Sequence, residues 1–252
     1  MLALSFLLGI VLASRRAAKR GVSPNLIYDM SIILIITAIV GSRGLYILTH
    51  IENYNSILDI IALWQGGATY YGGLILAIAG AVVYLRVKKI SFLKIADICS
   101  PSIAAGIFLT RIGCFLSGCC FGLPTDSSLG VVFPPGSPAG NIYPHLHIHP
   151  SQLYSSFYGL VILVLLLLLE RKKIFDGFTF SFLCIFYGLA RFITDFFRFY
   201  EDSAFVYGLI TSNQLISIGL IVLGVVLLIV LGRAGVTEKM KTPDKTAGTE
   251  GG

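Results

Sequence analysis

The feature that most constrains this chain is a series of long apolar runs separated by short charged connections. A helix needs about 20 mostly apolar residues to cross the hydrocarbon core of a bilayer, which is about 30 Å thick. Only 13% of the 252 residues are charged, against about a quarter in a soluble domain. We therefore predict an all-α polytopic membrane protein with seven transmembrane helices, near 1–14, 26–49, 68–85, 95–118, 150–169, 177–196 and 211–232.

Lysine and arginine collect in alternate connections. They follow the first, third, fifth and seventh runs, at 15–20, 86–94, 171–173 and 233–245. Because cytoplasmic loops carry the excess of these residues, the N-terminus is predicted outside and the C-terminus in the cytoplasm. This distribution also accounts for the net charge of +6 without a nucleic-acid partner.

The ends of the chain and one connection need separate interpretations. The first run, 1–14, would reach only about 20 Å as a helix, so it is either a short helix or the remainder of a longer ancestral one. We predict a transmembrane domain over 1–235 and a disordered tail over 236–252, where Thr, Lys, Gly and Glu predominate. The connection 50–65 is predicted to lie along the membrane interface.

Four arginines lie outside these charged connections, and three of them are within or at the margins of the apolar runs: Arg43, Arg111, Arg191 and Arg198. An arginine at mid-membrane costs about 3 kcal/mol on insertion scales. Such residues usually face a bundle interior or a watery cavity, and snorkelling to the outer headgroups is the alternative.

The sixth run carries a more specific pattern. Tyr187, Arg191, Asp195 and Arg198 are spaced at i, i+4, i+8 and i+11, which places them on one helical stripe. Asp195 is expected to orient Arg191 and to leave other guanidinium donors for a phosphate, whose geometry the guanidinium fork matches. The alternative is an internal ion pair that only fixes helix packing.

Glycines recur where backbone or lipid could approach closely. One group is Gly72–Gly73 at the start of the third run, where exposed backbone N–H groups could meet an anion. The other, Gly113, Gly118 and Gly122, follows Arg111. Helix packing explains either group as well.

The longest outer loop, 119–149, holds three histidines at alternate positions and lies beside three cysteines. Their spacing matches no standard zinc pattern. Three interpretations stay open: a metal site, a disulfide joining Cys114 to Cys119 or Cys120, and small packing residues.

Several short motifs, taken together, resemble the bacterial prolipoprotein diacylglyceryl transferase family, in its order and spacing, from residue 1 to about 230. They are Gly41-Ser-Arg43 with Tyr46, Gly72-Gly73-Leu74, Asp97 with Pro101, Arg111-Ile-Gly113 with Gly118 and Gly122, His149-Pro-Ser-Gln-Leu-Tyr154, and Tyr187-Gly-x-x-Arg191 with Asp195-Phe-Phe-Arg198.

The resemblance implies a multi-pass enzyme of the bacterial inner membrane. Its substrates would be phosphatidylglycerol and prolipoproteins with a lipobox cysteine, whose thiol receives the diacylglyceryl group as glycerol phosphate leaves. It implies no metal and no organic cofactor. Because the nucleophile belongs to the prolipoprotein, the enzyme would not need its own cysteines for that role.

The resemblance also implies a site. Arg111 and Arg191 match the family's essential arginines and would stabilise the charge of the leaving phosphate. Tyr71 and His149 are further catalytic candidates. Substrate binding is expected from Arg43, Gly72, Gly73, Gly113, Gly118, Gln152, Tyr154, Tyr187, Asp195 and Arg198.

Five features depart from the family pattern. Tyr71 stands where a histidine is typical, Cys114 replaces an asparagine, Cys119 an acidic residue and Ser155 a glutamate. The Tyr-Gly that is usual at the start of the first helix is absent. Two other functions therefore stay open: a membrane transferase that uses the same anionic phospholipid with a different acceptor, and a non-enzymatic lipid-binding membrane protein.

Overall fold

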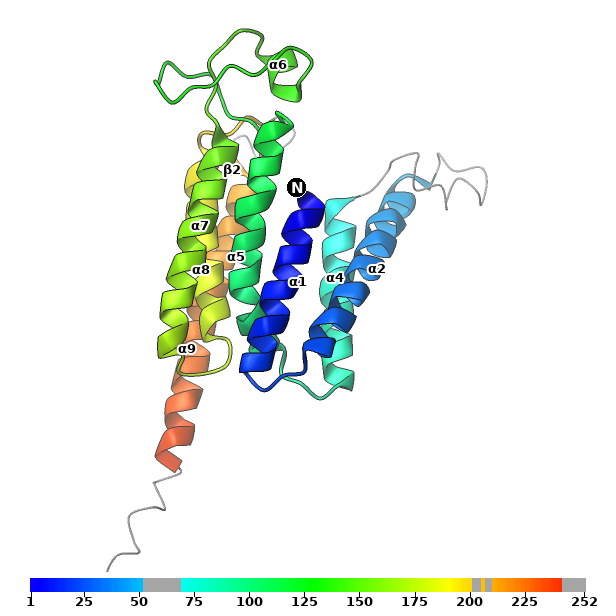
Figure 1. The fold of residues 1–252 in the computed structure, drawn as a ribbon, viewed down its shortest axis with the longest axis vertical. Helices are drawn as coiled ribbons and strands as arrows, with labels where there is room; N and C mark the ends of the chain where they lie inside the picture. Colours follow the sequence, from blue (N-terminus) through cyan, green and yellow to red (C-terminus); the bar gives the residue numbers. More distant parts are fainter. Residues whose placement is uncertain (52–68, 201–204, 207–209, 242–252) are drawn as a thin grey trace, which may run out of the picture. The chain divides into compact units, whose positions relative to one another are not determined.

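The protein is almost entirely helical. The computed structural model describes residues 1–51, 69–200, 205–206 and 210–241 (Figure 1). The predicted interfacial segment 50–65 lies almost wholly outside the described residues, as does the end of the predicted tail, 242–252. The long helices are α1 (Leu2–Lys19), α2 (Pro24–Thr49), α4 (Tyr70–Val87), α5 (Phe92–Leu116), α7 (Ser151–Leu169), α8 (Phe178–Asp195) and α9 (Ser212–Lys241).

Several helices suit a bilayer. Within the described residues, five stretches are long and apolar enough to cross a membrane: α2, α5, α7 with the 3-10 turn after it, α8 and the first part of α9. A multi-pass helical membrane protein is thereby confirmed. Two helices extend beyond the predicted bounds: α1 continues past residue 14 to Lys19, and α9 continues past residue 235 to Lys241.

The chain divides into two compact units: unit 1 is residues 1–11 and 96–252, and unit 2 is residues 12–95. In unit 2, α2 and α4 lie side by side (Figure 1). Gly41 and Gly72 make this possible, because a Cβ on Gly72 would lie 2.3 Å from the Gly41 carbonyl oxygen. Two helix backbones thus touch at a point where only glycine fits.

Unit 1 is built around α5, α7, α8 and α9. Its core includes Ala104 of α5, Tyr158 and Ile162 of α7, and Leu183 of α8. Helix α9 lies against α8 at two glycines, because a Cβ on Gly188 would lie 2.8 Å from the carbonyl oxygen of Ser217, and one on Gly224 would lie 2.6 Å from that of Ser181.

Asp97 of α5 caps the N-terminus of α8. Its carboxylate is fully buried and accepts 2.9 Å hydrogen bonds from the backbone N–H groups of Gly177 and Phe180. Lys173 lies 3.0 Å from the same carboxylate. A negative charge at the start of a helix satisfies exposed N–H groups and interacts favourably with the helix dipole.

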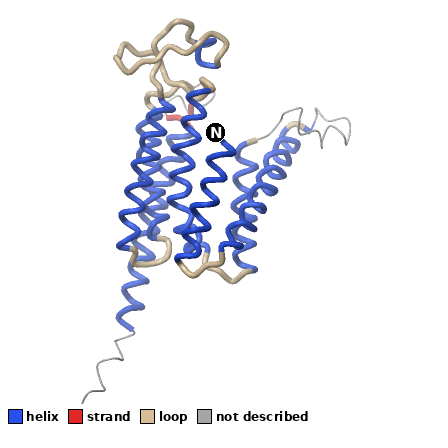
Figure 2. The backbone as a smooth tube through the Cα atoms, viewed as in Figure 1, coloured by secondary structure: helices blue, strands red, loops and turns tan. Residues whose placement is uncertain are grey.

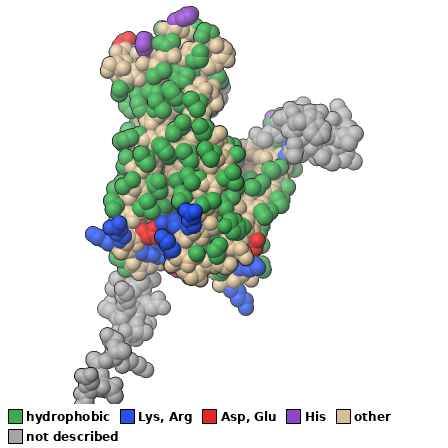
Figure 3. Space-filling model, in the orientation of Figure 1, with side chains coloured by type: hydrophobic (Ala, Val, Ile, Leu, Met, Phe, Trp, Pro, Cys, Tyr) green, Lys and Arg blue, Asp and Glu red, His purple; other side chains and the backbone are tan. Residues whose placement is uncertain are grey.

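The loop between α5 and α7 forms a small cap on one end of unit 1 (Figure 2). It contains α6 (Pro138–Ile142), and its core includes Phe121, Phe133 and Ile148. Figure 3 shows the histidine side chains on this loop and apolar side chains along the helices below it. After α8, β1 (Phe205–Val206) pairs antiparallel with β2 (Ile210–Thr211), a ladder that the all-α prediction did not include.

Candidate functional site

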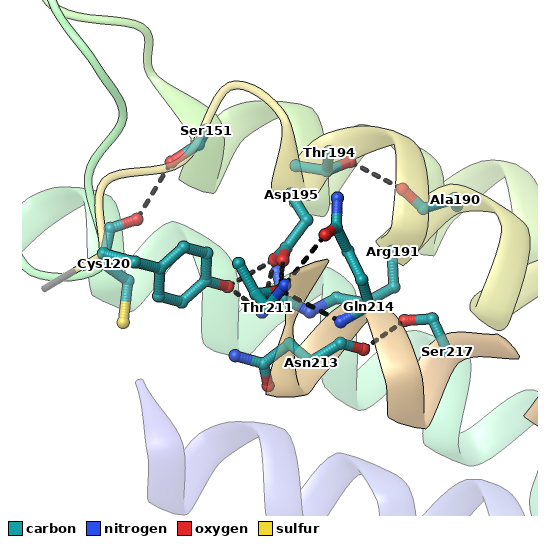
Figure 4. A network of polar contacts seen from close by, with 11 residues as sticks. Cys120, Ser151, Ala190, Arg191, Thr194, Asp195, Thr211, Asn213, Gln214 and Ser217 are labelled. Carbon is teal, nitrogen blue, oxygen red and sulfur yellow. Dashed lines mark hydrogen bonds and ion pairs between the residues drawn. The ribbon is translucent and has the colours of Figure 1, made fainter. Parts of the chain in front are cut away.

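A polar network surrounds Asp195 at the end of α8 (Figure 4). Its carboxylate lies 3.1 Å from Nη2 of Arg191, one turn earlier on the helix. It also accepts short hydrogen bonds from the hydroxyl groups of Tyr200 and Thr211. The Tyr200 hydroxyl in turn accepts a 2.5 Å hydrogen bond from Nη2 of Arg191. Arg191 is therefore held by two groups at one end of its guanidinium.

Thr211 joins this network to the start of α9. Its backbone N–H donates to the Gln214 side chain over 3.0 Å, while the Gln214 backbone N–H donates to the Thr211 hydroxyl over 3.1 Å. This reciprocal arrangement is a capping box. The pattern Thr-x-x-Gln before an apolar run is a helix-start signal that the sequence analysis did not use, and its link to Asp195 depends on the tertiary structure.

The contacts of Arg191 with Tyr200 and Asp195 both involve Nη2 and leave its Nη1 unused within the described part of the chain. Arg191 is only 6% exposed, and its Nη1 has no hydrogen-bond partner among the described residues. A buried charged donor normally has a partner. An anionic group brought by a substrate would supply one.

Tyr158 lies near both Arg191 and Arg111. The buried Tyr158 phenol on α7 lies within electrostatic reach of both guanidinium groups, and its ring meets that of Tyr187 with 6.2 Å between centroids. The sequence analysis did not select Tyr158. Its only signal was the spacing of four residues after Tyr154, which places both on one face of α7.

His149 and Tyr154 form a second group at the start of α7. The His149 Nδ1 and the Tyr154 hydroxyl are 3.1 Å apart, and both rings contact Phe197. Arg198 follows Phe197, and its guanidinium lies 5.3 Å from the centre of the Tyr200 ring. The Nε of Arg198 is a second buried donor with no partner among the described residues.

Three residues predicted to bind substrate also have structural contacts at this end of α5 and α7. Gln152 is fully buried and donates a 2.7 Å hydrogen bond to the Cys119 carbonyl. Gly118 ends α5 in the left-handed region, with φ +65°, where glycine is favoured. A Cβ on Gly113 would lie 2.6 Å from that of Met1, so its role is a close approach between α1 and α5.

The remaining predicted site residues belong to unit 2. Arg43 is buried within α2, whereas Tyr71 is 51% exposed near the start of α4. Gly72 lies at the close contact between α4 and α2. Gly73 lines an open, mostly apolar groove of about 580 Å³, together with Ser42 and Thr69. Such a groove suits an acyl chain better than a phosphate.

The matches to known proteins cover most of the chain. The sequence matches the family model described as prolipoprotein diacylglyceryl transferase over residues 1–230. The chain belongs to this family. Among its relatives is the phosphatidylglycerol–prolipoprotein diacylglyceryl transferase of Clostridium tetani, 34% identical over 89% of this chain and 88% of that protein. The protein of the same name from Geobacter sulfurreducens is 33% identical over 92% of this chain and 89% of that protein.

Within this family member, three cysteines at the C-terminal end of α5 and in the turn after it form a cluster. All five cysteines are free thiols, so neither candidate disulfide is present. The sulfur atoms of Cys114, Cys119 and Cys120 lie within 4.8 Å of one another. Burial, together with the two neighbouring thiols, raises the pKa of Cys119 to about 12. A thiol with this pKa is a poor nucleophile at neutral pH, because the thiolate is the reactive form.

Tyr200 is a further residue of the network that the sequence analysis missed. Burial and the hydrogen bond to Asp195 raise the pKa of its phenol to about 12. The phenol therefore stays protonated at neutral pH, where it can accept from Arg191 and donate to Asp195. Its position two residues after Arg198 was the only signal available in the sequence.

Proposed function

We propose that this protein transfers the diacylglyceryl group of phosphatidylglycerol to the thiol of a lipobox cysteine in a prolipoprotein. The observation that supports this most directly is Arg191, a buried and oriented guanidinium with one nitrogen that lacks a partner among the described residues. A phosphodiester headgroup would offer the oxygen atoms this nitrogen requires.

The proposed transfer reaction requires a cation near the phosphate. The acceptor sulfur forms a bond to a glycerol carbon, and the bond from that carbon to a phosphate oxygen breaks. The electron pair leaves with glycerol phosphate, so negative charge grows on the phosphate in the transition state. Oriented cations in a water-poor site stabilise this charge, and we assign that role to Arg191 and Arg111.

The acceptor approaches from outside the cell in this proposal. Seven helices cross the inner membrane, α1 and α4 included, with the N-terminus outside. The asymmetry of lysine and arginine supports this orientation. In unit 1, the exposed Arg171 and Lys172 follow the C-terminal end of α7, whereas the loop with three histidines precedes its N-terminal end. The basic residues and the histidine loop are therefore at opposite ends of α7. His149 and Tyr154 then lie at the outward-facing surface of the inner membrane, where a secreted precursor presents its cysteine.

The test uses the purified full chain with phosphatidylglycerol and a synthetic lipobox peptide. We expect the mass of the peptide to rise by one diacylglyceryl group on its cysteine, with release of glycerol phosphate. A peptide with serine in place of cysteine is the matched control. Release of glycerol phosphate without peptide modification would indicate a different acceptor, and the absence of both products would leave only lipid binding.

A further inference from the structure

Cys114, Cys119 and Cys120 are placed by backbone structure that does not depend on their sulfur atoms. Cys114 occupies the last turn of α5, and its carbonyl accepts a 3.1 Å hydrogen bond from the Cys119 N–H. The Cys119 carbonyl is bound by Gln152, and the Cys120 carbonyl accepts a 2.9 Å bond from the Ser151 hydroxyl. Two residues at the start of α7 thus fix the turn that carries the thiols.

This turn has an unusual backbone. Gly118 and Cys120 have φ values of +65° and +58°. A left-handed conformation is uncommon for a residue with a Cβ, and at Cys120 it belongs to the turn that gathers three sulfur atoms within 4.8 Å. All three side chains are half-buried, so an incoming group can reach them.

We propose that these three thiols bind one Zn²⁺ ion and leave its fourth position open for the thiol of the acceptor cysteine. Zinc prefers tetrahedral sulfur and nitrogen ligands at about 2.3 Å, and three protein ligands with one open position are typical of its catalytic sites. Ligands in that geometry are about 3.8 Å apart, and the three sulfur atoms lie within 4.8 Å of one another.

The charges suit this ion. Three thiolates with Zn²⁺ carry one net negative charge. The Arg111 guanidinium lies within electrostatic reach of Cys114 and Cys120, and it would balance that charge. Cys114 follows Arg111 by three residues on α5, so the two side chains share one face of the helix.

The inference rests on the proposed function, and it assigns the step that activates the acceptor. A free cysteine thiol, with a pKa of about 8.5, is mostly protonated at neutral pH, whereas a zinc-bound thiol is deprotonated. The acceptor thiol would lose its proton to solvent on binding zinc. Its sulfur would then form the thioether bond to the glycerol carbon as the phosphate ester departs. The neutral thioether is a weaker ligand, so the product can leave.

Metal content is measured first, independently of activity. The full chain, purified without oxygen in reducing buffer, is expected to contain one zinc per chain by mass spectrometry. Each of the single substitutions Cys114→Ser, Cys119→Ser and Cys120→Ser should reduce zinc retention at least tenfold. Cys184→Ala, at a buried cysteine of α8 outside the cluster, should retain zinc. Circular dichroism and gel filtration establish that each variant is folded.

The acceptor's role is tested with Co²⁺ in place of zinc. The cobalt protein is expected to show thiolate-to-cobalt charge-transfer absorption, and a lipobox peptide should change its visible bands, whereas the cysteine-to-serine peptide should not. A wild-type protein with three reactive thiols and no zinc, or with a disulfide among them, overturns the metal site. A cobalt spectrum indifferent to the peptide overturns the open position.

Transfer activity separates this inference from the proposed function. Removal of zinc by a chelator should lower transfer at least tenfold, and added zinc should restore it. Full transfer by the metal-free protein overturns the zinc inference and leaves the proposed function standing. A zinc-loaded protein that never modifies the peptide overturns the proposed function, and with it the assigned role of the fourth position.

Discussion

At the residue scale, the Asp195 carboxylate is the centre of the site. It contacts Arg191, Tyr200 and Thr211 at once. A charge buried in an apolar helix bundle is costly unless several groups compensate it. These contacts fix the direction in which Arg191 points, and so, in the proposed function, where the phosphate would bind.

Arg191→Lys tests whether transfer depends on the paired donors of the Arg191 guanidinium. Lysine keeps the charge but loses the planar pair of donors, so we expect transfer to fall at least about tenfold, a typical loss for one oriented donor. Arg111→Lys should behave alike. The rate of peptide modification is measured at saturating lipid. Arg171→Lys, on the exposed connection after α7, is the matched control and should be unaffected. Normal turnover by a folded Arg191→Lys protein would exclude the phosphate clamp.

Tyr200→Phe tests the phenol in the network through its pH dependence. The folded-state pKa is about 12, above the ordinary value of about 10. Its contribution to stability is therefore complete below about pH 10 and is lost as the pH rises through about 12. We expect Tyr200→Phe to be less stable than wild type by about 1 kcal/mol at neutral pH, with the difference shrinking above about pH 10. Thermal unfolding in detergent across this range measures it, and a constant difference would contradict the assignment.

At the element scale, unit 2 depends on how closely α2 and α4 approach. The two helices meet at Gly41 and Gly72, where each glycine faces the other's carbonyl oxygen. Gly72→Ala would place a methyl group 2.3 Å from that oxygen. Because backbone cannot rotate away as a side chain can, we expect a loss of about 3 kcal/mol, the upper range for overpacking. Thermal unfolding measures the loss.

Gly44→Ala is the matched control on α2. A Cβ there meets nothing within 4 Å, and alanine favours the helix by up to about 1 kcal/mol. This variant should be as stable as wild type or more so. Equal effects of Gly44→Ala and Gly72→Ala would show that helix propensity, rather than the close approach, determines the outcome.

The start of α8 offers a second test, at Asp97. Asp97→Asn removes the buried charge that caps the helix and pairs with Lys173. We expect a loss of about 3 kcal/mol, as is typical when one partner of a buried pair is removed. Asp176→Asn is the control, because Asp176 lies 2.6 Å from the same lysine but is exposed. It should cost less than about 1 kcal/mol. Similar unfolding temperatures for the two variants would refute the capping role.

At the scale of the whole molecule, the proposed orientation makes opposite predictions for two connections. Single cysteines are introduced by Asp126→Cys and Lys172→Cys, in a background without the five native cysteines. An impermeant thiol reagent applied to intact cells should label position 126, which the positive-inside rule places outside. Position 172 should react only after the cells are opened. The reverse pattern would overturn the topology.

The amino-acid sequence by itself determined the helical membrane class and the family. Both follow from local features: apolar runs long enough to cross a bilayer, and motifs whose residues are neighbours in the chain. Arg191 and Asp195 could be paired from the sequence because a helix brings residues four apart together. The capping box of Thr211 and Gln214 was readable for the same reason.

Tertiary structure alone decided which distant groups meet. Tyr158 lies near both Arg111 and Arg191 because α7 lies in the same unit as α5 and α8. Asp97 caps α8 across about 80 residues of chain, and Gln152 binds the turn that carries Cys119. The cluster of three thiols likewise depends on the left-handed turn at Cys120. No spacing rule gives these contacts, because side-chain periodicity specifies the face of a helix but not what that face touches.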